Sequence, residues 1–164
     1  MGIGGRQPYC PGHDNKHLNT SKIVTVDFAR PDRGGEERIN YSSLPFETGK
    51  HSIGGIFCSA DLDITHPVGF GYRSREITVY RDNTMFINPL SGQGSNVAVY
   101  RATPVLSGFA TARNRDMLPG KVSVASVKKG RGTITIFVDD PVFRGCWYGT
   151  DKLLLNAIFF GSGI

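Results

Sequence analysis

The clearest hydrophobic pattern in the chain begins with six apolar or β-branched residues, Thr-Ile-Thr-Ile-Phe-Val, at positions 133–138. A short run of this kind, bounded by glycine and by two aspartates, is typical of a buried strand. A glycine-rich aromatic loop follows, and a second apolar run then extends from Asp151 to Gly161. Thr150 suits the N-cap of a helix and Gly161 its C-cap. The pattern predicts strand, loop and helix over residues 133–161.

The apolar strand favours a central place in a parallel sheet, because strands buried on both faces are apolar throughout. Ligands of such sheets lie beyond the carboxyl ends of the strands, which directs attention to residues 139–149. The final helix is apolar on nearly every side and needs cover from the sheet and from a second element. The remaining residues look too few for both, so we expect part of the domain to be missing.

Shorter runs with β-type composition precede this unit and predict a strand-rich domain. The expected elements are a strand at residues 23–28, strands at 55–60, 96–100, 104–108 and 122–127, and one or two helical turns at 111–116. Residues 76–80 and 84–87 flank Arg81-Asp82-Asn83, which predicts a hairpin.

Length and composition limit the number of domains that the chain can contain. Its 164 residues fit one domain or part of one, and 21 glycines with nine prolines indicate many turns. Residues 1–50 are predicted to be a loop-rich N-terminal segment and residues 51–164 the folded part. No apolar run approaches the roughly 18 to 20 residues of a membrane span, and the N-terminus lacks the pattern of an export signal.

The net charge is +5, but lysine and arginine are scattered along the chain. The longest basic stretch is Lys128-Lys129 with Arg131. This distribution predicts a solvated surface and makes nucleic acid an unlikely partner. A metal- or polyanion-binding module remains an alternative, because His13 and His17 are spaced as metal ligands are on a helix.

Residues 139–149 carry the first set of candidate binding residues. Asp139, Asp140 and Arg144 are expected to pair with one another or to cap the loop. Trp147 and Tyr148 are expected to form part of a lid on the core, and alternatively a binding rim.

Asp61, Asp63 and His66 form the second candidate set, on a segment that should be extended. Alternation would send the two carboxylates to one side, as in a metal site or an acid/base pair. The simpler prediction is a turn in which Asp63 and its neighbours satisfy backbone N–H groups before Pro67.

Three cysteines give an odd count without Cys-x-x-Cys spacing, so no disulfide framework is expected. Cys146 precedes the N-terminus of the predicted helix, where a thiol pKa would fall. A small cysteine-dependent hydrolase or amidotransferase using Cys146 or Cys58 is therefore an alternative function. Neither cysteine stands in the Gly-x-Cys-x-Gly pattern of a nucleophile elbow.

Several segments resemble the C-terminal region of bacterial zinc carboxypeptidase-family proteins, in which a class I glutamine-amidotransferase-like domain follows the peptidase domain. The segments are residues 61–72, 104–108, 130–132, 139–150 and 155–161. The resemblance implies an α/β fold: part of an amidotransferase-like (flavodoxin-like) sheet, with a hairpin insertion and a C-terminal helix.

The chemistry of that family is not expected in this chain. Its zinc site needs His-x-x-Glu, and none of the four histidines is followed by Glu at that spacing; its amidotransferase relatives use His-x-Glu, whereas Pro67 and Val68 follow His66. We therefore expect no cofactor and no catalytic residue here. The resemblance implies a non-catalytic accessory domain or fragment that assists a peptidase domain or binds a peptide or protein substrate. The parent proteins suggest a secreted or periplasmic setting.

Overall fold

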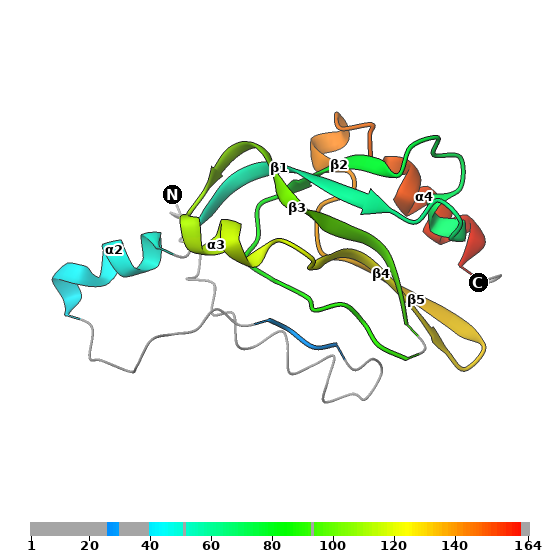
Figure 1. Ribbon diagram of the computed structural model, residues 1–164, viewed down its shortest axis with the longest axis horizontal. Helices are drawn as coiled ribbons and strands as arrows, with labels where there is room; N and C mark the ends of the chain where they lie inside the picture. Colours follow the sequence, from blue (N-terminus) through cyan, green and yellow to red (C-terminus); the bar gives the residue numbers. More distant parts are fainter. Residues whose placement is uncertain (1–25, 30–39, 51, 93, 162–164) are drawn as a thin grey trace, which may run out of the picture.

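A computed structural model describes residues 26–29, 40–50, 52–92 and 94–161 (Figure 1). The strands are β1 (Ile53–Leu62), β2 (Glu76–Arg81), β3 (Gly94–Ala110), β4 (Val122–Lys129) and β5 (Gly132–Phe137). The α-helices are α2 (Leu44–Gly49), α3 (Ala112–Met117) and α4 (Asp151–Phe160), and the 3-10 turns are η1 (Tyr41–Ser43), η2 (Pro67–Gly69) and η3 (Phe143–Gly145). The predicted strand-rich fold with a C-terminal helix is confirmed.

The five strands form one curled sheet in the order β2-β1-β3-β4-β5 (Figure 1). Every pairing between neighbouring strands is antiparallel. The prediction of a parallel sheet was wrong, and the flavodoxin-like arrangement, which is parallel, is not confirmed.

The β4–β5 connection explains the antiparallel order. Lys129 pairs with Gly132, so the loop between the strands is only Gly130-Arg131, and Gly130 takes a φ of 60°. Two-residue loops join antiparallel strands, and a positive φ at the first loop position suits them. β5 is therefore an edge strand, not a central one, and its residues from Thr133 onward are only partly buried.

β3 combines two runs that the sequence pattern separates. Cys58 of β1 pairs with Val105, and Ala60 pairs with Tyr100, so β3 has extra residues between the two pairs. Pro104, which cannot donate a ladder hydrogen bond, falls within this bulge. The strand continues through the proline because the proline does not have to pair there.

The hairpin predicted around residues 81–83 was wrong. β2 pairs with β1, whereas Ile87 makes single bridges to Phe28 and to Val122 of β4. Residues 84–87 therefore cross to a different strand. Of the strand predicted at residues 23–28, the described part contributes the Phe28 bridge, the buried side chain of Val26 and the Asp27 carbonyl, which accepts from the Asn88 N–H at 2.9 Å.

Two hydrophobic clusters lie against the sheet. The larger one includes Ile56, Leu62, Phe86 and, from α4, Leu153. The smaller one packs Val26 and Ile87 against Val122, Ala125 and Val138.

The C-terminal helix follows its prediction closely in extent. α4 has Thr150 as its N-cap residue and Gly161 as its C-cap residue. The Thr150 hydroxyl does not cap the helix, however, because it donates to the Pro141 carbonyl at 2.8 Å. α3 lies where helical turns were expected, and β4 where a strand was expected.

Candidate functional site

Four polar side chains from four parts of the chain meet inside the curled sheet. Arg81 ends β2, Tyr100 lies in β3, Ser123 lies in β4 and Asp139 follows β5. All four residues are buried. We call them the buried polar cluster.

Asp139 is the centre of this cluster. Its Oδ1 accepts from Arg81 Nη1 at 3.0 Å, and its Oδ2 accepts from the Ser123 hydroxyl at 2.5 Å and from the Tyr100 hydroxyl. Arg81 also donates from Nη1 to Tyr100 Oη at 2.9 Å and from Nη2 to the Met85 carbonyl. Asp139 was expected to pair with Arg144; it pairs with Arg81 instead, because the sheet brings the end of β2 beside it.

Burial dominates the electrostatics of the cluster. It raises the pKa of the Asp139 carboxyl, against the opposing effect of Arg81 and the hydrogen bonds. Burial, and then the charge of Asp139, raises the pKa of Tyr100 well above its ordinary value. The Tyr100 hydroxyl therefore stays protonated and donates a hydrogen bond to Asp139 Oδ2.

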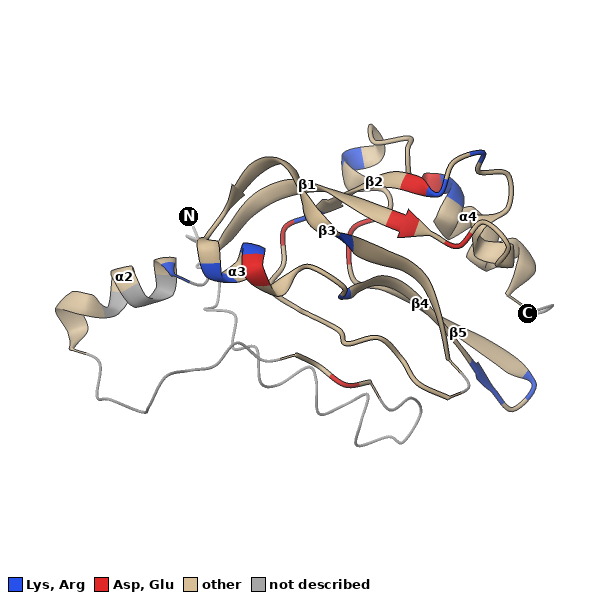
Figure 2. Ribbon diagram, viewed as in Figure 1, with Lys and Arg blue, Asp and Glu red and all other residues tan. Residues whose placement is uncertain are grey.

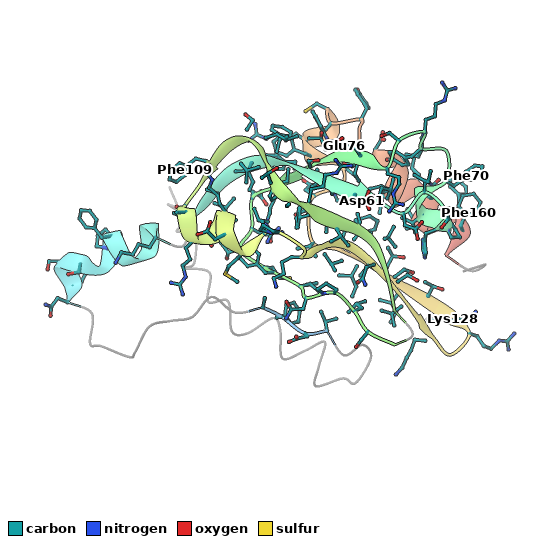
Figure 3. The ribbon with its side chains drawn as sticks, viewed as in Figure 1. Asp61, Phe70, Glu76, Phe109, Lys128 and Phe160 are labelled. Carbon is teal, nitrogen blue, oxygen red and sulfur yellow. The ribbon has the colours of Figure 1, made fainter. Side chains whose placement is uncertain are left out.

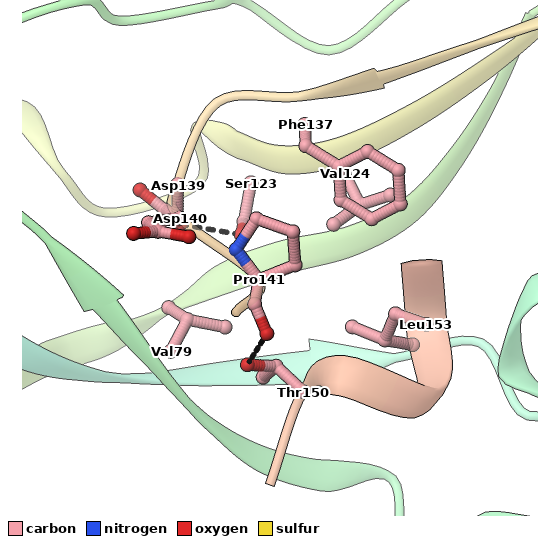
Figure 4. A pocket seen from close by; sticks show the side chains of 9 residues that line it. All are labelled: Val79, Ser123, Val124, Phe137, Asp139, Asp140, Pro141, Thr150 and Leu153. Carbon is pink, nitrogen blue, oxygen red and sulfur yellow. Dashed lines mark hydrogen bonds between the residues drawn. The ribbon is translucent and has the colours of Figure 1, made fainter. Parts of the chain in front are cut away.

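The cluster adjoins a small cavity at the start of α4 (Figure 4). The lining residues are Val79, Ser123, Val124, Phe137, Asp139, Asp140, Pro141, Thr150 and Leu153. The cavity offers about 10 Å³, close to the room that one water needs. The cavity is too small for an organic substrate. The contacts of Asp139 instead hold the segment that follows β5 in place.

The chain after β5 closes the curled sheet. The Val138 N–H donates to the Ser123 carbonyl at 2.9 Å. The backbone of Asp140 forms an antiparallel β-bridge with Tyr80 of β2. β2 and β5 are the two edge strands of the sheet. The buried polar cluster thus lies where the end of β5 meets the opposite edge.

The other candidate residues of the loop point elsewhere. Asp140 Oδ1 accepts from the Val142 N–H at 2.9 Å, which confirms its predicted loop-capping role. Arg144 is exposed, takes a φ of 51°, and holds its guanidinium 5.2 Å from the Phe143 ring centroid. The structure does not bring Arg144 and Asp139 together as a pair.

Trp147 covers the edge strand β2. Its Nε1 donates to the Thr78 carbonyl at 3.1 Å, and its ring lies 4.8 Å from that of Phe57. Phe143 stacks on Tyr80 at 3.6 Å. The predicted lid is confirmed for Trp147, whereas Tyr148 is 78% exposed.

The second candidate set forms no shared site. Asp61 lies in β1 and pairs with Arg75 at 2.7 Å, whereas Asp63 accepts from the Thr65 N–H and hydroxyl at 2.9 and 2.6 Å. His66 Nδ1 accepts from the Val68 N–H at 3.2 Å. The prediction of a capped turn is confirmed for Asp63 and His66, whereas for Asp61 it was wrong, because Asp61 belongs to β1 and pairs with Arg75.

Of the cysteines and histidines, Cys58, Cys146 and His66 lie within the described ranges. Burial raises the pKa of Cys58 to about 12, whereas Cys146 is exposed and its thiol lies 3.5 Å from the Phe143 carbonyl. Within the described ranges, no group of three His, Cys, Asp or Glu residues is placed to hold a metal ion. Cys10, His13, His17 and His51 lie outside those ranges. No helix in the described part of the chain is long and apolar enough to cross a membrane.

A largely apolar surface lies on α4. Its inner side buries Leu153 and Asn156, and Asn156 Nδ2 donates to the carbonyls of Val68 and Phe70 at 2.8 Å each. On the other side Leu155 (49% exposed), Ile158 (67%) and Phe159 (75%) face solvent. Phe160 (39%) follows Asn156 by four residues and therefore lies on the inner side, where it contacts the exposed Phe70 (65%).

We call these five residues the α4 surface. Phe70 and Phe160 lie beside each other, with ring centroids 5.6 Å apart (Figure 3). The helix pattern anticipated that α4 would lack cover. It did not indicate Phe70, which joins the surface only because η2 packs beside α4.

Comparisons with protein-family models, with characterised proteins and with solved structures gave no match for this chain. The resemblance to zinc carboxypeptidase-family proteins therefore stays a prediction.

Proposed function

We propose that this chain is a non-catalytic protein-binding module that packs the α4 surface against another protein. The observation that carries the proposal is the exposure of Ile158 and Phe159, at 67% and 75%, on a helix whose other side is anchored in the core. Contiguous apolar patches of this kind mark interaction sites on proteins that stay in solution.

The composition of the α4 surface supports this role. Three of its five residues are phenylalanines, and aromatic residues are enriched at the centres of protein interfaces. α4 carries no charged residue after Lys152 (Figure 2). A partner would therefore bury this part of the helix without having to desolvate a charge.

Two observations weigh against the alternative functions. A Cys58 thiol with a pKa near 12 is protonated at neutral pH and is a poor nucleophile. The cavity at the buried polar cluster holds about one water, too little for an acyl or amide substrate. No contact of the described residues favours cysteine chemistry or a metal site.

The family resemblance supplies one candidate class of partner, the peptidase domain of a zinc carboxypeptidase-like protein. It would also relate the sheet to part of an amidotransferase-like fold. Both ideas depend on the resemblance alone, whereas the protein-binding role depends on the α4 surface.

Binding of the dye ANS, which fluoresces on exposed apolar surface, tests the proposal. We expect native protein to enhance ANS fluorescence, and the double variant Ile158→Lys/Phe159→Lys to lose most of the signal. Phe46→Lys is the matched control, because Phe46 is 77% exposed on α2 and lies outside the α4 surface. A signal that is absent from the native protein, or unchanged in the double variant, would contradict the proposal.

A further inference from the structure

We propose that β5 is the docking strand for an extended, acidic segment of another protein, which joins the sheet as a further strand beside β5. This site goes beyond the protein-binding role of the α4 surface, because it uses backbone groups of a different element. The hydrogen-bonding pattern of β5, the protection of the edges of β2 and β3, and the charges beside β5 support it.

Alternate residues of β5 direct their backbone groups away from β4. The Val138 N–H donates to the Ser123 carbonyl at 2.9 Å, and this pair continues the β4–β5 register. Hydrogen-bonded and non-hydrogen-bonded pairs alternate along an antiparallel ladder, so the even-numbered residues of β5 bond to β4. The N–H and C=O groups of Thr135 and Phe137 therefore point outward. Within the described part of the chain, no other backbone group bonds to them.

β5 lacks the features that usually protect an edge strand. Proteins block such edges with proline, charged side chains, bulges or a covering element. The register of β5 with β4 is unbroken, and residues 133–137, Thr-Ile-Thr-Ile-Phe, include neither a proline nor a charge. Regular edges of this kind accept further strands through main-chain hydrogen bonds.

The edges of β2 and β3 are protected. On β2, the Thr78 carbonyl accepts from Trp147 Nε1 at 3.1 Å, and Tyr80 forms its bridge with Asp140. The part of β3 that extends past β4 contains Pro104, within a bulge. A proline and a bulge both impede the addition of a strand. β5 is therefore better suited to accept a strand than β2 or β3.

The position of the β4–β5 hairpin leaves β5 accessible. The hairpin projects past the other strands (Figure 1). α4, which follows β5 in the chain, packs mainly against η2. An extended segment can therefore approach β5 from the side opposite β4.

The charges at the tip of this hairpin favour an acidic segment. Lys128 and Arg131 are exposed there (Figure 2), and no described carboxylate forms an ion pair with either of them. β5 itself contains no charged residue. A segment with Asp or Glu near the tip would gain complementary charge at one end of the strand, while its backbone pairs along the rest.

A second copy of this chain fits the edge less well. Two paired β5 strands would both be uncharged and would supply no carboxylate to the hairpin tips. The acidic residues that follow β5 are turned away from it, because Asp139 bonds to Arg81 and Asp140 bridges to Tyr80. The edge therefore suits a partner that brings its own acidic residues.

Fluorescence anisotropy with the full chain tests the docking strand. The probe is a labelled peptide of alternating threonine and valine with glutamates at both ends, and we expect saturable binding with a Kd below about 1 mM. Thr135→Pro removes an outward N–H and keeps the ladder to β4, so it should weaken binding at least tenfold. The control Thr135→Ala retains the N–H and should bind within about twofold of the native protein. Absence of binding, or equal affinities for the two variants, would overturn the inference.

Backbone methylation of the peptide is a test that leaves the protein unchanged. N-methyl groups along the threonine-valine run remove the N–H donors and keep the side chains and charges. The methylated peptide should therefore lose its binding. If it binds as well as the unmodified peptide, charge alone holds it and strand addition is wrong.

Charge reversal tests the preference for an acidic segment. Lys128→Glu/Arg131→Glu should weaken binding of the glutamate peptide at least tenfold and should favour a peptide with lysines in place of the glutamates. Equal binding of the two peptides by the native protein would show that the acidic class of partner is wrong.

Two controls separate this site from the other possible occupants and surfaces. Ile158→Lys/Phe159→Lys should bind the glutamate peptide as the native protein does, and a loss would place the peptide on the α4 surface instead of β5. Sedimentation velocity should show no self-association that depends on Thr135. A dimer that disappears in Thr135→Pro would assign the β5 edge to a second copy and overturn the proposed partner.

Discussion

Arg81 and Asp139 form an ion pair in which Nη1 lies 3.0 Å from Oδ1, although the two residues are 58 positions apart in the sequence. Their side chains are 0% and 4% exposed. This pair joins the end of β2 to the segment after β5. It therefore stabilises the closure of the sheet at the point from which the loop to α4 begins.

Removal of Asp139 should be costly. Asp139→Ala leaves Arg81 charged and buried without its carboxylate, and we expect the free energy of unfolding to fall by about 3–5 kcal/mol. Urea denaturation measures this loss. Asp140→Ala is the control, with an expected loss of about 1 kcal/mol or less, because Asp140 is exposed and caps only the Val142 N–H. Equal losses in the two variants would contradict the central place of Asp139.

The sequence singled out Asp139 as a candidate binding residue but did not predict that Arg81 is its ion-pair partner. Arg144 is five residues away and was the local choice, whereas Arg81 becomes a neighbour only when β2 and β5 lie at opposite edges of a curled sheet. Capping residues such as Asp63 and Asp140 were predictable, because their partners lie two residues away. Local contacts follow from local sequence, and this ion pair does not.

The parallel sheet was mispredicted for a related reason. The apolar run at residues 133–138 resembles a central strand, but residues 85–90 and α4 supply its cover on the two sides of the sheet. The two-residue loop Gly130-Arg131 was the better signal, because it requires an antiparallel neighbour. The extent of α4 was predicted well because Thr150 and Gly161 bound its apolar run, although the Thr150 hydroxyl does not cap the helix.

Gly108 should not tolerate a side chain. It has a φ of 94°, and an added Cβ would lie 2.2 Å from the Gly55 carbonyl oxygen. We expect Gly108→Ala to lower the free energy of unfolding by at least about 2 kcal/mol. Gly120→Ala isolates the backbone effect, since Gly120 has a φ of 71° with open space around it, and should cost about 1 kcal/mol. The close approach of β1 and β3 would be refuted if Gly108→Ala were the milder change.

Stability should depend on pH through His66. Burial lowers the pKa of His66 below its usual 6.5, and the neutral ring accepts the Val68 N–H. The folded state thus binds fewer protons, so this contribution is present above pH 6.5 and is lost as pH falls through the lower folded pKa. His66→Asn, which can still accept, should lose less stability between pH 6.5 and 5. Identical pH profiles for the two proteins would contradict this assignment.

The two described cysteines should differ sharply in reactivity. With native protein at pH 8, iodoacetamide should modify Cys146, which is exposed, and spare Cys58, whose buried thiol has a pKa near 12. Peptide mass spectrometry identifies the modified sites, and denatured protein gives the reference for full labelling. Modification of Cys58 in the native protein would show that the core around β1 opens readily.

The most direct test of the protein-binding role is the free energy of unfolding of Ile158→Lys/Phe159→Lys, measured in urea at low protein concentration, where self-association is negligible. If these side chains serve a partner, the variant should lie within about 0.5 kcal/mol of the native protein, as for most surface substitutions. A loss of about 3 kcal/mol or more, the size expected when core residues are disrupted, would show that the α4 surface belongs to the protein's own core.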